Sequence, residues 1–140
     1  MTAGDPLYAS CVAVGGRGLL ILGPSGSGKS GLALALIALG ADLVADDQTL
    51  LTLQDGALIA TCPKPLAGMI EARGVGLLAA PTAASARIAL AVDLGQSEDQ
   101  RLPPRRTVTI RGVAVDLVLR TGFDHFPAAL MLYLKHGRRA

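Results

Sequence analysis

The sequence GPSGSGKS occupies residues 23–30 and decides the fold of this chain. It matches the pattern G-x-x-x-x-G-K-[ST] at every fixed position. It follows the apolar run Leu19–Leu22 and precedes Ser30–Leu39, which is rich in Ala and Leu. A strand, a glycine-rich loop and a helix in this order form a phosphate-binding loop, or P-loop. We favour this interpretation over a flexible loop that merely caps a helix, because the match is complete and in context.

The residue types in this loop suit the binding of a nucleotide phosphate. The glycines allow the backbone to curl, so that its N–H groups and the helix N-terminus face an anion. We predict that Lys29 contacts the β- and γ-phosphates of a nucleotide, and that the Ser30 hydroxyl coordinates Mg²⁺. The predicted nucleotide-binding residues are Gly23, Pro24, Ser25, Gly26, Ser27, Gly28, Lys29 and Ser30.

Two aspartates, Asp46 and Asp47, directly follow the apolar run Leu43–Ala45. If the helix returns the chain across the sheet, this run forms a strand parallel to Leu19–Leu22 and ends beside the P-loop. We expect one carboxylate to reach the Mg²⁺ and the other to accept a proton from an incoming hydroxyl. The alternative is a solvated strand end that caps the turn before Thr49.

The rest of the chain predicts strands around a single long helix. Three pairs of apolar runs predict β-hairpins: Cys11–Val14 with Leu19–Leu22, Thr49–Leu53 with Ala57–Cys62, and Thr107–Ile110 with Val113–Leu119. The other predicted segments are a strand at Ile88–Leu94, a helical turn at Gly68–Arg73, a mobile polar connection at Gly95–Arg106, and a closing helix at Pro127–Lys135 capped by Asp124. The chain is thus predicted to be one α/β domain over residues 1–140, with a mixed sheet and few helices.

Composition limits the functions that this domain can have. Hydrophobic residues make up 51% of the chain and charged residues 17%, which excludes intrinsic disorder. The net charge of +2 is too small for a nucleic-acid groove or a membrane-binding patch, so we expect neither partner. No signal peptide or membrane-spanning run is visible, which predicts a cytoplasmic protein. Cys11 and Cys62 have no nearby Cys or His partner and are predicted to be core residues.

Three further positions carry weaker signals. Glu71 and Arg73 lie beside two glycines in an otherwise uncharged region, and they could form a further wall of the site. A Glu and an Arg at this spacing are also common as a surface ion pair. Arg101, in the polar connection, has less local support. The histidines His125 and His136 are interpreted as surface or packing residues of the final helix.

The order of these motifs resembles a known family. A P-loop, then LVADD at 43–47, then IEARGVG at 70–76 is similar to the C-terminal catalytic domain of bacterial HPr kinase/phosphorylase, over most of residues 7–120. The short alphaproteobacterial form of that family is particularly similar. The resemblance implies a P-loop, PEP-carboxykinase-like nucleotide-binding fold. It also implies a kinase that phosphorylates a serine of the phosphocarrier protein HPr with ATP and Mg²⁺, and a homo-oligomer, since the family is hexameric.

The resemblance also assigns roles to individual residues. Lys29 would hold the transferred phosphate, and Ser30 would bind Mg²⁺. Asp47 would accept the proton of the serine hydroxyl, and Glu71 would be a further metal ligand. A family arginine before a leucine matches Arg101-Leu102. The predicted catalytic residues are therefore Lys29, Asp46, Asp47 and Arg101, and the predicted metal ligands are Ser30 and Glu71.

Three departures from the family pattern bear on function. Tyr8 stands where the family has a histidine, and Gly31 follows the loop serine where an acidic residue is common. The turn linked to phosphorylase activity is shortened to Arg111-Gly112, so the reverse reaction is left open. Two rival functions also stay open at this point: a P-loop kinase of small molecules, and a nucleotide-binding regulatory module without catalysis.

Overall fold

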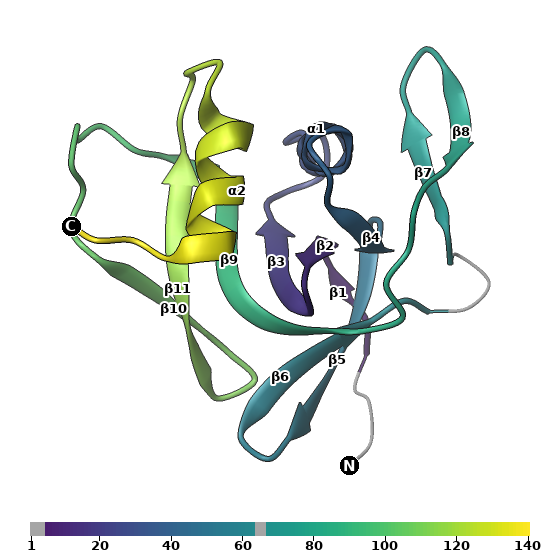
Figure 1. Ribbon diagram of the computed structural model, residues 1–140, viewed down its shortest axis with the longest axis horizontal. Helices are drawn as coiled ribbons and strands as arrows, with labels where there is room; N and C mark the ends of the chain where they lie inside the picture. The colour runs from purple at the N-terminus through teal and green to yellow at the C-terminus, as the bar shows by residue number, and fades with distance from the viewer. Residues whose placement is uncertain (1–4, 64–66) are drawn as a thin grey trace.

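The computed structural model describes residues 5–63 and 67–140, and these form a mixed α/β structure (Figure 1). Nine strands form one sheet, two strands form a separate hairpin, and the described residues contain two helices. The strands are β1 (Leu7–Tyr8), β2 (Ser10–Val14), β3 (Arg17–Leu22), β4 (Asp42–Ala45), β5 (Gln48–Gln54), β6 (Ala57–Thr61), β7 (Met69–Ala72), β8 (Gly76–Ala79), β9 (Ala86–Ser97), β10 (Arg106–Ile110) and β11 (Val113–Arg120). The helices are α1 (Lys29–Ala38) and α2 (Phe126–His136).

The long strand β9 joins the parts of the main sheet. On one side it pairs in parallel with β3. On the other side it pairs first antiparallel with β6 and then in parallel with β11. The carboxyl ends of β3, β9 and β11 therefore lie at the same edge of the sheet, which is the edge where the P-loop leaves β3.

The sheet buries apolar side chains on both faces. The two helices cover one face, and the hairpins β5–β6 and β10–β11 contribute to the core on the other. The register of β3 against β9 shifts between Gly18 and Leu19, which leaves Ala89 as an extra residue in β9. Because of this bulge, Ile88 and Leu90 belong to opposite cores although they are two residues apart.

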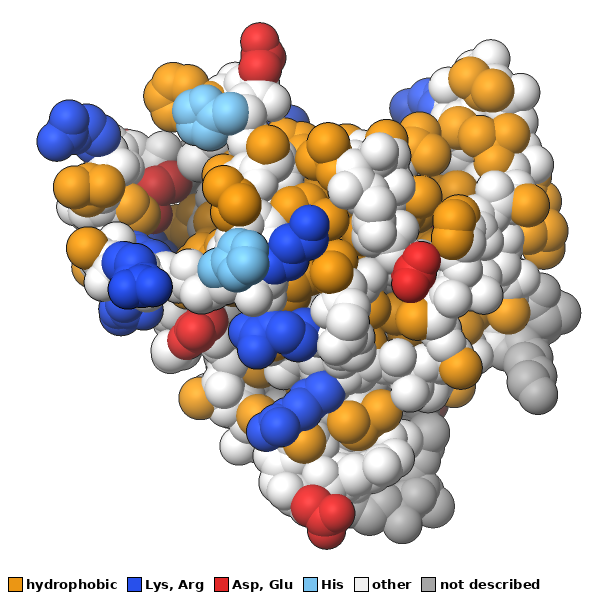
Figure 2. Space-filling view, in the orientation of Figure 1, with side chains coloured by type: hydrophobic (Ala, Val, Ile, Leu, Met, Phe, Trp, Pro, Cys, Tyr) orange, Lys and Arg blue, Asp and Glu red, His pale blue; other side chains and the backbone are white. Residues whose placement is uncertain are grey.

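The predicted hairpins, the strand at Ile88–Leu94 and both long helices are confirmed. The helix after the P-loop was expected to be covered on most sides, and the structure shows this coverage to be partial. The helix α1 packs on β2, β3, β4, β7 and α2, and one side of it is fully buried through Lys29, Ala33 and Leu36. The next side chains, Leu32, Leu34 and Ile37, are half-buried against the same core. Figure 2 shows hydrophobic side chains across this face of the molecule.

The helical turn predicted at Gly68–Arg73 is wrong, because these residues contribute strand β7, which pairs with β8. Buried and exposed side chains alternate along this segment, but the small residues around it make the alternation hard to see in the sequence. Ile70 and Ala72 are buried, whereas Met69 and Glu71 point to solvent. This period of two belongs to a strand with one covered face.

Two other expectations need correction. The polar connection begins later than predicted, because β9 continues through Gly95 to Ser97, which pairs with Arg120 of β11. Asp124 does not cap α2: the N-cap is His125, with no side-chain capping bond, and a proline stands in the first turn. None of the described helices is long and apolar enough to span a membrane.

The central position of Leu90 gives a test of this topology. Its side chain is 1% exposed, and its backbone lies between Leu19 of β3 and Asp116 of β11. We expect Leu90→Ala to lower the free energy of unfolding by about 2–5 kcal/mol, because it leaves a cavity in the core. Denaturant titration measures this effect. The control Leu102→Ala, at a side chain 69% exposed, should change stability by less than about 0.5 kcal/mol.

Candidate active site

The P-loop has the curled backbone that phosphate binding requires. Gly23, Gly26 and Gly28 have φ angles of 149°, 82° and 99°, which side chains other than glycine rarely adopt. Lys29 is buried, with 8% of the residue exposed. Its ammonium group donates hydrogen bonds to the carbonyl oxygens of Gly23 at 2.8 Å and Pro24 at 3.1 Å. These bonds hold the lysine charge over the loop, where phosphate oxygens would lie.

The predicted approach of the aspartates to the P-loop is confirmed in its geometry. Strand β2 lies between β3 and β4 and is antiparallel to both, so β4 runs in the same direction as β3. The Ser30 Oγ donates to Asp46 Oδ1 at 2.7 Å. The side chain of Asp46 therefore faces the loop serine and does not cap the following turn.

Ser10 is a site residue that the sequence analysis did not assign. It is fully buried, and its hydroxyl donates to Asp46 Oδ1 at 2.9 Å and accepts the backbone N–H of Asp47 at 3.1 Å. One hydroxyl thus fixes the side chain of one aspartate and the backbone of the next. The only signal in the sequence is a small polar residue at the start of an apolar run.

The two aspartates have different surroundings. Asp46 is half-buried and bonded to two hydroxyls, whereas Asp47 is exposed and has a φ of 67°, in the left-handed region that Asp tolerates better than most residues. The carboxylate of Asp47 accepts no hydrogen bond from the residues that the structure describes. This arrangement leaves Asp47 accessible to a group that arrives from solvent.

The Ser30 and Asp46 side chains fit a Mg²⁺ ion, which prefers hard oxygen ligands and needs only one or two from the protein beside substrate phosphates. Glu71, the other predicted ligand, is exposed on β7. Over residues 5–63 and 67–140, no group of three or more His, Cys, Asp or Glu side chains is close enough to hold a metal. The structure therefore brings Ser30 and Asp46 together, and the role of Glu71 stays a prediction.

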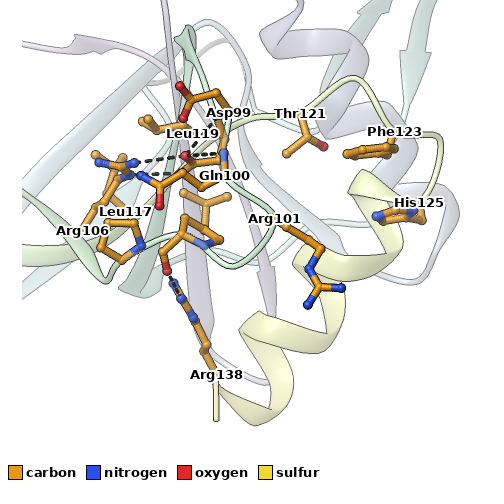
Figure 3. Close-up of a pocket in the computed structure, with 14 residues that line it drawn as sticks. Asp99, Gln100, Arg101, Arg106, Leu117, Leu119, Thr121, Phe123, His125 and Arg138 are labelled. Carbon is orange, nitrogen blue, oxygen red and sulfur yellow. Dashed lines mark hydrogen bonds and ion pairs between the residues drawn. The ribbon is translucent and has the colours of Figure 1, made fainter. Parts of the chain in front are cut away.

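Arg101 lies in another part of the site. It lines a cavity of ≈ 530 Å³ at the carboxyl ends of β9 and β11 (Figure 3). Its guanidinium makes no hydrogen bond to Lys29, Asp46 or Asp47 in the described part of the chain. Its predicted catalytic role is thus neither supported nor contradicted by a contact.

Two further residues lie near the aspartates. Tyr8 is 69% exposed, and its backbone pairs with Gln48, the residue that follows Asp47. Cys62 is half-buried, and burial together with the Asp46 carboxylate raises the pKa of its thiol. Cys11 is fully buried, as predicted, and burial raises the pKa of its thiol to about 12. Both pKa shifts favour the protonated thiols.

Comparison with known proteins places this site in a family. The family model of the HPr Serine kinase C-terminal domain matches residues 1–108. The chain belongs to this family. HPr kinase/phosphorylase of Clostridium botulinum (strain Eklund 17B / Type B) is 46% identical over 72 residues, which are 51% of this chain and 24% of the relative. The enzyme of Clostridium tetani (strain Massachusetts / E88) is 45% identical over 76 residues, or 54% of this chain and 25% of the relative.

The fold comparison extends over more of the chain. The solved structure of the Hpr(Ser) kinase/phosphatase from Coxiella burnetii superposes with a TM-score of 0.79 and 26% identity, covering 94% of this chain and 89% of that one. This confirms the predicted fold class, a P-loop α/β fold with a mixed sheet and few helices. The matched region spans about a quarter of the length of the curated HPr kinase/phosphorylase relatives.

The hydroxyl of Ser10 provides a test of how the aspartates are held. We expect Ser10→Ala to lower the free energy of unfolding by about 1–3 kcal/mol, because it removes a buried hydroxyl that bonds to both the Asp46 carboxylate and the Asp47 N–H. It should also weaken the Mg²⁺-dependent part of nucleotide binding, since Asp46 loses one of its two donors. Denaturant titration and nucleotide binding with and without Mg²⁺ measure both effects. If Ser10→Ala behaves like Ser85→Ala, a matched change at an exposed serine, the hydroxyl has no positioning role.

Proposed function

We propose that this protein is an ATP-dependent serine protein kinase whose substrate is the phosphocarrier protein HPr. The observation that carries the proposal is the meeting of the P-loop with the end of β4, where Ser30 lies 2.7 Å from Asp46 and Asp47 is the next residue. This edge of the sheet thus offers groups that can bind phosphate, hold a metal ion and accept a proton. The family membership and the names of the relatives support HPr as the acceptor.

The reaction transfers the γ-phosphoryl group of ATP to a serine hydroxyl. The P-loop amides and Lys29 hold the phosphates, while Ser30 and Asp46 would hold Mg²⁺, which neutralises charge on the phosphate oxygens. As the serine oxygen bonds to phosphorus and the bond to ADP breaks, the hydroxyl proton goes to Asp47. Asp47 suits this role because its carboxylate is exposed and free of hydrogen bonds among the described residues.

Several parts of this proposal rest on the resemblance. They are Glu71 as a further metal ligand, Arg101 as a catalytic group, and a homo-oligomer with six copies as the family implies. One catalytic domain over residues 1–140 and a cytoplasmic location rest instead on the length and the pattern of the sequence. The exposed apolar side chains of the β7–β8 hairpin support association between copies, since a small chain gains by covering them. They are Met69, Val75, Leu77 and Leu78.

Lys29→Ala tests the kinase activity. We expect the rate of HPr phosphorylation to fall by about 100-fold or more, because a charge that stabilises the transferred phosphoryl group is lost. Transfer of labelled phosphate from ATP to HPr, to a small-molecule extract, or to neither separates this function from its two rivals. Lys135→Ala, at an exposed lysine of α2, is the matched control. Activity of Lys29→Ala within about threefold of the unchanged protein would contradict the proposal.

The roles of the two aspartates can be separated by amide substitutions. Asp47→Asn should lower kcat by about 100-fold or more and leave ATP binding unchanged, because an amide cannot accept the serine proton. Asp46→Asn should instead weaken Mg²⁺-dependent ATP binding, since Asp46 contacts Ser30. Steady-state rates and equilibrium binding on the same samples measure both. The opposite pattern would exchange the two roles.

A further inference from the structure

A cavity of ≈ 530 Å³ lies outside the carboxyl ends of β9 and β11 (Figure 3). One wall consists of Thr121, Phe123 and His125, and the opposite wall includes Arg106 and Leu117. The volume is in the usual range of small-molecule sites, about 300–1,000 Å³. In α/β sheets, ligands bind outside the carboxyl ends of parallel strands. We propose that this cavity binds the purine nucleoside of the ATP whose phosphates lie on the P-loop, which rests on the proposed kinase function.

The order of strands supports this direction for the nucleotide. On one side of β3, strands β2 and β4 bring Asp46 to Ser30, which makes that side the place of the metal and the terminal phosphate. On the other side of β3 lie β9 and then β11. A triphosphate that ends near Asp46 and extends away from the metal side is directed toward β9 and β11, where the cavity lies.

The P-loop is joined directly to the strand ends that border the cavity. Arg120, the last residue of β11, donates from Nη1 to the carbonyl oxygen of Ser27 in the loop at 3.3 Å. The Arg120 carbonyl accepts the N–H of Glu98, which lines the cavity, at 2.8 Å. A nucleotide can thus pass from the loop to the cavity along one continuous stretch of the protein.

Two buried hydroxyls flank this connection without any hydrogen-bond partner among the described residues. They are Ser27 Oγ in the loop and Thr121 Oγ1 in the cavity wall. Buried polar groups are almost always hydrogen-bonded, and one that is not marks a place where a ligand can supply the partner. Thr121 Oγ1 itself has almost no accessible surface, so its side chain would rotate about χ1 to present the hydroxyl to a nucleoside hydroxyl or ring nitrogen in the cavity.

The lining favours a flat, weakly charged group over a second phosphate. The ring of Phe123, 66% exposed, stacks on His125 at 5.1 Å between centroids and 8° between planes, which presents an aromatic surface for a base. Glu98 accepts two bonds of 3.0 Å from the Arg106 guanidinium, which lowers the pKa of Glu98 and neutralises both charges. Leu117 adds apolar surface beneath them.

The remaining arginines do not make the cavity an anion site. The guanidinium of Arg138 is bonded to the backbone carbonyls of Pro103 and Ala140. Arg101 has no hydrogen-bond partner in the described part of the chain, and the acidic residues Glu98 and Asp99 belong to the same lining. Arg101 lines the same cavity, from which its guanidinium would contact the bound nucleotide.

Binding of ATP and of inorganic tripolyphosphate by the full chain tests the proposal. Thr121→Val, which replaces the hydroxyl by a methyl group, and Phe123→Ala should each weaken ATP binding by about fivefold or more and leave tripolyphosphate binding unchanged. Lys29→Ala should weaken the binding of both ATP and tripolyphosphate. Leu132→Ala, at a side chain 62% exposed on α2, is the control and should affect neither. Because Phe123 is largely exposed, its variant should keep the fold.

The possible results separate this inference from the kinase function. If Thr121→Val and Phe123→Ala bind ATP like the unchanged protein, the cavity does not hold the nucleoside, although the kinase function stands. Variants that keep ATP affinity but raise the KM for HPr would assign the cavity to the protein substrate and overturn the inference. If the unchanged protein binds neither ATP nor tripolyphosphate, both proposals fail.

Discussion

The hydrogen bond between Ser30 Oγ and Asp46 Oδ1 is the contact on which the site depends. It joins the first turn of α1 to the end of β4, and these segments meet only because the chain returns across the sheet between them. The strand β2 must then fit between β3 and β4, which requires the buried residues Val12 and Leu19 beneath α1. The core of the helix-covered face therefore determines the distance between the loop serine and the carboxylate.

The strand β9 divides the site into two halves with different chemistry. Toward β2 and β4, hydroxyl and carboxylate oxygens gather, which suits a metal ion and proton transfer. Toward β11, the lining is aromatic, apolar and charge-paired. Because β3, β9 and β11 are parallel, their carboxyl ends lie at one edge and a single elongated ligand can contact both halves.

The sequence predicted the parts of the fold that have strong local signals. The P-loop, the hairpins and the position of Asp46 follow from short runs of residues and from the rule that a helix returns the chain across a sheet. Strand β7 was missed because Ala and Gly around Ile70 hide its alternation. The bulge at Ala89 and the cavity were also beyond prediction, since they depend on pairings between segments far apart in the chain.

Ser10 shows why local signals do not suffice for a site. In the sequence it is one small polar residue before an apolar run, a position where serine usually has no special role. In the structure it is fully buried, so its hydroxyl must be bonded, and the partners within reach are the Asp46 carboxylate and the Asp47 N–H. The same hydroxyl thus binds the side chain of Asp46 and the backbone of Asp47, whose φ of 67° lies in the left-handed region. Two adjacent aspartates therefore have different surroundings because a third residue bonds to both of them.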